Sequence, residues 1–346
     1  MAIPFEVILF LFMLATALSV MYLTDLFAAA MVTGVFSLLS AGLFTLMDAV
    51  DVAFTEAAVG AGISTVLILG TLALTTDKED QQAFRWGPAI VVTVLGAILI
   101  VGTLDMPHYG DPAAVIHNYL VPRYIEGATT EFGIPNIVTV VLASYRGFDT
   151  LGETVVVLTA AVGVMLLLGS LRRRDPDDRT STVERLTMTP DSAPSLMMEH
   201  TILRVATMFL TPLILLFALY VQFHGDFGPG GGFQAGVIFA AGLILHGIIF
   251  GLTSVQGVAP PRVMRVGLAV GVLLYAGTGV ASLLLGGNYL DYAVLDSHDP
   301  IHGRHLGILL VEGGVGITVT CAMTLIFYNV AGRRFARSGE KDQASK

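Results

Sequence analysis

Long apolar runs recur along this chain and limit what it can fold into. A helix needs about 20 consecutive apolar residues to cross the ~30 Å hydrocarbon core of a bilayer, and about nine runs meet that length. Hydrophobic residues make up 54% of the 346 residues and charged residues 13%, too few charges for a soluble domain of this size. The sequence therefore predicts an all-α polytopic membrane protein with about nine transmembrane helices.

Polar breaks, most of them short, separate the runs. The runs cover residues 3–22, 26–47, 52–75, 86–104, 154–171, 202–222, 233–252, 263–286 and 306–330. The first run is preceded by no Lys or Arg and contains Glu6, so it lacks the basic leader of a secretory signal. We expect it to remain as a span.

Basic residues are distributed unequally between the two sides of this arrangement. Of the 18 Lys and Arg residues, all but Arg123, Arg146 and Arg304 fall in alternate connections, at the ends of the runs beside those connections, or in the C-terminal tail. Because Lys and Arg accumulate in cytoplasmic loops, the N-terminus is predicted outside and the C-terminus in the cytoplasm.

The segment 172–200 is the one long polar stretch between runs that contains Pro and Asp, which indicates a cytoplasmic linker. It separates a five-span domain, 1–171, from a four-span domain, 201–332, so two helical bundles are expected. Residues 333–346 form a cytoplasmic tail. The net charge of −9 gives no sign of nucleic-acid binding, and the lone Cys321 excludes a disulfide framework or a thiolate metal site.

Three ionisable residues, Arg146, Asp149 and Glu153, lead directly into the run 154–171. Charges at membrane depth cost about 2.5–3.5 kcal/mol each on insertion scales and mark ion or proton pathways. Helical spacing places Arg146 near Asp149 and Asp149 near Glu153, all on one face. The alternative is an ion pair that anchors the mouth of the helix.

A second acidic group opens the third run. Asp48 and Asp51 are spaced to cap a helix start, and a place in the ion pathway is the alternative for Asp51. Glu56 lies about 7 Å deeper along a helix, too far for capping. It is predicted to serve a proton or Na⁺ site, or to be a neutral acid hydrogen-bonded to a neighbouring helix.

The segment 224–234 is rich in glycine. No Lys-Ser/Thr pair follows it and no strand precedes it, which argues against a phosphate-binding loop. Pro229, Gly230, Gly231 and Gly232 are instead predicted to form a close-packed turn that enters a helix.

The last run holds one acid, Glu312, which its apolar context makes a candidate for a buried ionisable site. Just before it, His298, His302 and His305 could be taken for a metal site. No fixed fourth ligand accompanies them, so a polar loop is the favoured interpretation and no metal is expected.

All three lysines lie outside the runs, whereas a self-sufficient proton pump would be expected to bury a lysine. The chain is therefore expected to work with other subunits.

Two sets of motifs resemble a known family. DAVDVAFTEAAVGAG and IPNIVTVVLASYRGFDTLGE, within residues 1–170, resemble the C-terminal part of the A subunit of Mrp-type multisubunit Na⁺/H⁺ antiporters. FHGDFGPGGGFQAG and LLVEGGVGITV, within 197–332, resemble its B subunit. The first half is also similar to the J-type subunit of respiratory complex I, and the same modules resemble parts of membrane-bound hydrogenases.

The resemblance implies an accessory subunit of a proton-motive-force-driven Na⁺/H⁺ antiporter in the bacterial cytoplasmic (inner) membrane. It implies no cofactor, Na⁺ and H⁺ as cargo, and partner subunits that carry the lysine-bearing proton channels. Asp149 and Glu153 match family acids linked to ion movement, and Glu56 belongs to the acidic start of the J-like helix. Some relatives carry that acid one turn later, where this chain has Gly60.

Two alternatives remain open. The first is the membrane arm of a hydrogenase or of a complex I-like redox pump, without a cluster in this chain, since one cysteine cannot hold one. The second is a structural scaffold.

Overall fold

The computed structural model describes residues 5–72, 75, 78–79, 85–108, 111–169 and 201–344, with no side-chain account of Gly169 or of 333–344. In these ranges the regular structure is helical, apart from an isolated bridge between Asp25 and Lys78. The linker 172–200, the start of the chain and its last two residues lie outside the described residues.

The helices are α1 (Phe5–Val20), α2 (Leu26–Leu46), α3 (Val50–Glu56), η1 (Ala57–Ser64), α4 (Thr65–Leu72), α5 (Trp86–Thr103), η2 (Ile116–Leu120), α6 (Val121–Gly127), η3 (Ala128–Phe132), α7 (Ile137–Val140), η4 (Val141–Tyr145), α8 (Gly147–Gly169), α10 (Thr201–His224), α11 (Gly232–Phe250), α12 (Leu252–Val258), α13 (Pro261–Leu284), η7 (Tyr292–Leu295) and α14 (Pro300–Ala344).

Eight segments of the described chain are long and apolar enough to cross a membrane, and α3, η1 and α4 form one of them. The shorter α1 has 16 residues. At 1.5 Å per residue it is about 24 Å long, less than the ~30 Å core. The predicted all-α polytopic fold is confirmed, with eight segments of full spanning length and a ninth, shorter apolar helix.

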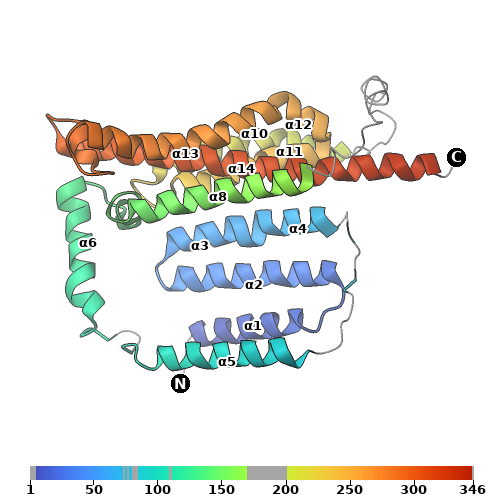
Figure 1. Ribbon diagram of the computed structural model, residues 1–346, viewed down its shortest axis with the longest axis horizontal. Coiled ribbons are helices and arrows are strands. Elements are labelled where there is room, and N and C mark those ends of the chain that lie inside the picture. Colours follow the sequence, from blue (N-terminus) through green and yellow to red (C-terminus); the bar gives the residue numbers. More distant parts are fainter. Residues whose placement is uncertain are drawn as a thin grey trace.

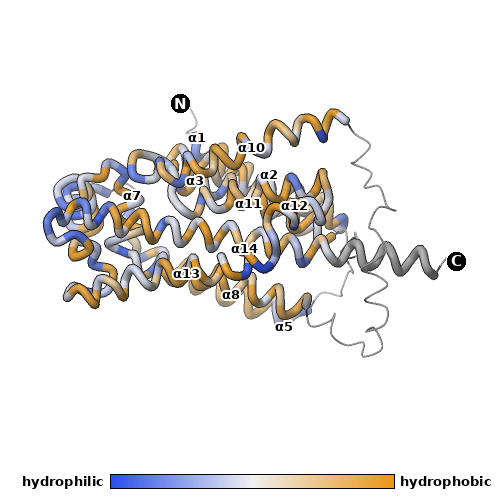
Figure 2. Tube along the Cα trace, turned by 90° about the horizontal axis from the view of Figure 1, so that it is seen from above, coloured by the Kyte–Doolittle hydropathy of each residue, from blue (hydrophilic) through white to orange (hydrophobic). Residues whose placement is uncertain are grey.

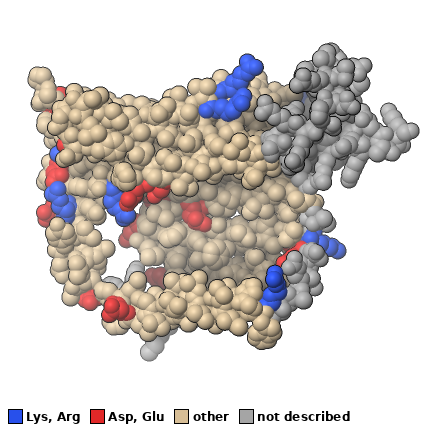
Figure 3. All heavy atoms as spheres, viewed as in Figure 1, with Lys and Arg blue, Asp and Glu red and all other residues tan. Residues whose placement is uncertain are grey.

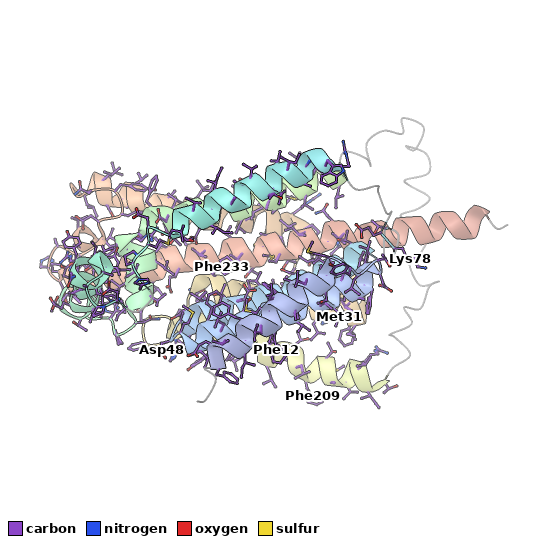
Figure 4. All side chains as sticks on the ribbon, turned by 90° about the horizontal axis from the view of Figure 1, so that it is seen from below. Phe12, Met31, Asp48, Lys78, Phe209 and Phe233 are labelled. Carbon is purple, nitrogen blue, oxygen red and sulfur yellow. The ribbon has the colours of Figure 1, made fainter. Side chains whose placement is uncertain are left out.

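The long helices run roughly parallel or antiparallel to one another (Figure 1). Apolar residues cover their middles, and hydrophilic residues gather toward the end that holds α7 (Figure 2). Asp48 and Lys78 mark opposite ends of the layer that contains α1 and α2 (Figure 4). Both views place α5 at an edge, and none of its residues is buried.

The two halves that the linker separates in the sequence pack against each other in the structure. Helix α8, from the first half, packs against α13 and α14 of the second, and η1 contacts α11. Helices α11 and α14 are the most buried spans of the described chain. The core therefore joins both halves.

Glycines let α13 and α14 approach closely. A Cβ added at Gly271 would lie 2.5 Å from the Gly314 carbonyl oxygen, and one at Gly267 would lie 2.6 Å from Cys321 Sγ. Side chains at these positions would force the helices apart. Small residues four apart commonly serve this purpose in membranes.

Two connections between the apolar runs contain helices. Residues 116–145 form short helices, of which α6 crosses one end of the long helices (Figure 1). The expected polar loop at His302 and His305 is wrong, because both histidines lie in the first turns of α14. Asp299 accepts hydrogen bonds from the N–H groups of Ile301 and His302, which caps that helix start.

Candidate ion-binding cavity

A cavity of about 250 Å³ lies where the two halves meet. Three acids line it, each from a different helix: Asp51 of α3, Glu153 of α8 and Glu312 of α14. Acidic side chains are visible within the otherwise uncharged middle of the molecule (Figure 3). Further polar lining comes from Thr55, Thr139, Thr150, Thr154, Gln234 and Tyr275, and from the backbone of Gly230, Gly231 and Gly232. The cavity is thus an acidic space surrounded by apolar helices.

Glu312 reaches from α14 into the glycine-rich loop. A Cβ added at Gly225 or at Gly231 would lie 3.1 Å from one of its carboxylate oxygens. The carboxylate makes no hydrogen bond or ion pair with any described side chain, and Asp226 and Asp51 lie close enough to repel it electrostatically. The glycines therefore make room for an acid that has no cationic partner among the described residues.

Asp51 holds the same loop from the other half of the chain. Its Oδ1 accepts a hydrogen bond from the Gly230 N–H at 3.0 Å, and its carbonyl oxygen accepts one from Gln234 Nε2 at 3.4 Å. The capping interpretation is wrong: the residue that precedes α3 is Ala49, and no side chain caps that helix. Asp48 instead has a left-handed backbone, with φ 57°.

The loop is anchored further by α7 and the residue before it. Asn136 Nδ2 donates to the carbonyl oxygens of Gly225 and Gly228 at 2.8 and 2.9 Å, and Thr139 Oγ1 donates to Gly225 at 2.7 Å. Gly231, which precedes α11, has φ +110°, a conformation that favours glycine. The loop is thus a close-packed turn that enters a helix, as predicted.

Two neighbours complete that turn. A Cβ at Gly230 would lie 2.6 Å from the Val221 carbonyl oxygen, and one at Gly232 would collide with the Glu312 carbonyl. Pro229 faces elsewhere, lining an apolar groove between α2, α3 and α10.

Arg146 and Asp149 form an ion pair at the start of α8. Arg146 Nη2 and Nε lie 2.6 and 2.7 Å from Asp149 Oδ2, and both side chains are exposed. Arg146 is not part of α8, because its φ of −119° ends η4. Glu153 lies one turn beyond Asp149 and lines the cavity instead of joining the pair. The three charges thus divide between the helix mouth and the cavity.

Glu56 lies outside the cavity lining. It ends α3, and its carboxylate occupies the space beside Gly60, where an added Cβ would lie 2.6 Å from Glu56 Oε1 and 2.5 Å from Ser37 Oγ. It therefore faces α2, whereas Asp51, one turn earlier, faces the loop.

Two buried tyrosines of the second half were not singled out by their sequence. The Tyr275 hydroxyl donates to the Gly147 carbonyl at 2.7 Å, and the Tyr292 hydroxyl donates to the Ala143 carbonyl at 2.8 Å. These carbonyls lie on either side of the break at Arg146. Burial raises the pKa of Tyr292 well above its ordinary value, which keeps it a donor. Gln234, Asn136 and Thr139 were missed as well, since their partners are distant in sequence.

Three family models match successive parts of the chain. Residues 202–325 match the family described as "Domain related to MnhB subunit of Na+/H+ antiporter". Residues 11–77 match the family of the D subunit of MBH, and residues 95–185 match the family of its E subunit.

Two relatives cover the chain differently. The Na⁺/H⁺ antiporter B subunit of Bacillus subtilis is 34% identical over 133 residues, which are 36% of this chain and 91% of that protein. The probable K⁺/H⁺ antiporter A/B subunit of Rhizobium meliloti is 28% identical over 326 residues, 87% of this chain but 32% of that protein. The chain thus spans about a third of the A/B relative.

A solved structure, that of the Mrp complex from Dietzia sp. DQ12-45-1b, shares the fold. It superposes with a TM-score of 0.68 at 24% identity, over 92% of this chain and 34% of the matched chain. Nearly all of a B subunit matches this chain at more than 30% identity, and both parts of the chain align in order with an A/B subunit. The chain therefore belongs to the Mrp-type Na⁺/H⁺ antiporter subunits, as an A/B-like membrane protein whose second half contains the MnhB-related domain.

Proposed function

We propose that this chain is an accessory subunit of a multisubunit cation/proton antiporter driven by the proton-motive force, and that its cavity forms part of the ion or proton pathway. The observation that carries the proposal is the meeting of Asp51, Glu153 and Glu312 around one space of about 250 Å³. No described basic side chain lines this space. The family membership supports antiport as the reaction class.

The chemistry follows from the cost of unpaired carboxylates. Charge in an apolar environment is unfavourable unless it is neutralised by a proton or a cation. Repulsion from Asp51 and Asp226 raises that cost at Glu312. Uptake of a proton or of Na⁺ relieves the repulsion, and release restores it, which is what a transit site for these ions requires.

The other predicted pathway residues take different places in this proposal. Asp149 lies at the mouth of α8 and forms an ion pair with Arg146, which partly neutralises the negative charge of its carboxylate. Glu56, against α2, is a separate acid outside the cavity. No cofactor is needed, and Na⁺ and H⁺ are cargo.

Assembly with other subunits is part of the proposal. Helix α5 has no buried residue, and the spans of the described chain include no lysine for a proton channel of their own. Lysine-bearing partner subunits in the bacterial cytoplasmic membrane would supply that channel. The predicted topology has the N-terminus outside. It would place the glycine-rich loop 224–234, and the end of the cavity that this loop lines, toward the outer side of the membrane.

The test is cation-dependent proton movement in membrane vesicles that contain the complete complex. Glu312→Gln and Glu153→Gln should each lower the initial rate at least about tenfold at normal complex abundance. Glu6→Gln, in exposed α1, is the matched control and should leave the rate unchanged. Unchanged rates in both cavity variants would remove these acids from the pathway. Parallel assays with Na⁺ and K⁺ identify the cation.

A redox-linked membrane arm is the second candidate, favoured by the matches of the first half to the D and E subunits of MBH. Iron–sulfur proteins in the purified complex would support it. Antiport by a complex without such proteins would exclude it.

A further inference from the structure

A second group of ionisable side chains lies beside the cavity, at the loop end of α14. His305 Nδ1 lies 3.3 Å from Asp226 Oδ2, and their side chains are 34% and 25% exposed. Neither residue lines the cavity, and His305 has no role in the function proposed above. The pair thus contacts both the surface and the loop that surrounds Glu312.

Asp226 is connected to Glu312 through Gly225. The Glu312 carboxylate lies against Gly225, the residue before Asp226, and is near enough to Asp226 for electrostatic repulsion. The backbone of Asp226 is fixed, because its carbonyl oxygen accepts a hydrogen bond from the Asn136 N–H at 3.2 Å. His305, Asp226 and Glu312 therefore form a series from a partly exposed imidazole to a cavity acid.

The other charged groups nearby have different partners. Arg304 donates to the Glu131 carbonyl oxygen and lies over the Phe132 ring, 5.0 Å from its centroid. His224 packs against Gly228 and stacks on the Tyr220 ring. Among the described residues, Asp226 is the carboxylate in contact with His305.

We propose that His305 and Asp226 form a proton relay between the loop-end surface and Glu312. The proposal rests on the proposed function, because it needs Glu312 as a proton acceptor and donor. Imidazole suits this position, since it exchanges protons near neutral pH through two distinct nitrogens.

The steps conserve protons and charge. A proton from the solvent (hydronium) binds Nε2 of neutral His305 while the proton on Nδ1 passes to Asp226 Oδ2. Asp226 then gives its proton to the Glu312 carboxylate. Exchange with solvent at the partly exposed ring returns the Nε2 proton to the solvent and supplies one to Nδ1, which restores the first tautomer with no net change in proton number. Reversal of the series releases a proton from the cavity to the surface.

The same helix offers a matched control pair. His302 Nδ1 lies 2.9 Å from Asp296 Oδ2, and His302 is 66% exposed. Hydrogen bonds from the His298 N–H and from His302 lower the pKa of Asp296, which therefore stays a carboxylate. This pair has the same chemistry but no contact with the glycine-rich loop.

The experiment compares the two pairs in vesicles that contain the complete complex. Asparagine can retain a hydrogen bond to the aspartate but cannot carry a proton. His305→Asn and Asp226→Asn should lower the initial proton flux at least about tenfold. His302→Asn and Asp296→Asn should retain it within about twofold. Wild-type flux in His305→Asn, or an equal loss in His302→Asn, would overturn the relay.

A second readout separates proton transfer from a structural role. Imidazole in the medium should restore flux to His305→Ala, because the site is partly exposed, and should leave Glu312→Gln unchanged. Failure of imidazole at normal complex abundance would contradict the relay. If Glu312→Gln and Glu153→Gln both transport normally, the proposed function fails; if Glu312→Gln is inactive while His305→Asn is normal, the relay alone fails.

Discussion

The Asp51 carboxylate accepts a hydrogen bond from the backbone N–H of Gly230, a residue 179 positions later in the chain. This contact joins the start of α3 to the loop around Glu312. Asp51→Ala should destabilise the complex by about 1–3 kcal/mol, because the N–H loses its acceptor. Asp51→Asn keeps an acceptor oxygen and should retain most of the thermal stability while losing transport. Equal melting temperatures for wild type and Asp51→Ala would contradict the anchoring role.

Alanine at Gly231 or Gly232 should prevent accumulation of a folded complex. Gly231 needs its left-handed φ, and a Cβ at Gly232 would collide with the Glu312 backbone. Gly257→Ala is the control, since a Cβ there meets nothing within 4 Å. Native gel electrophoresis measures the abundance, and normal assembly of both loop variants would show that the loop can relax.

Removal of either buried tyrosine hydroxyl should loosen the break between η4 and α8. Tyr275→Phe and Tyr292→Phe each leave a buried carbonyl without its donor, at a cost of about 1–3 kcal/mol. The midpoint of thermal unfolding should fall in both. Tyr220→Phe, whose ring is exposed, should leave it unchanged.

The Arg146–Asp149 pair should matter little for stability. Both partners are more than half exposed, and exposed ion pairs contribute about 0–1 kcal/mol. Arg146→Ala and Asp149→Asn should therefore unfold near the wild-type temperature. A transport defect in either variant would then reflect ion movement, whereas a large drop in stability would show that the pair holds the helix start.

Apolar runs were sufficient to predict the fold class, because lipid imposes length and composition on each span. Glu312 could be identified for the same reason, as an acid in an apolar run. The partners of Asp51 and the position of α8 could not be predicted, because they depend on contacts between the halves. Arg146 was expected in helical register with Asp149, but the break that removes it from α8 is held by tyrosines more than 100 residues away in sequence.

The close approach of Glu312 to the glycine-rich loop also has a genetic consequence. Glycine codons share their first two bases, so a third-base change at Gly231 or Gly232 is silent, whereas every missense change adds at least a Cβ. Most of those changes also introduce a charged, polar or branched group where the side chain of Glu312, at Gly231, or the backbone of α14, at Gly232, leaves little room. This short stretch should therefore accumulate silent changes while tolerating few protein-altering ones, and a mutational scan of the gene should find it among the least permissive parts of the chain.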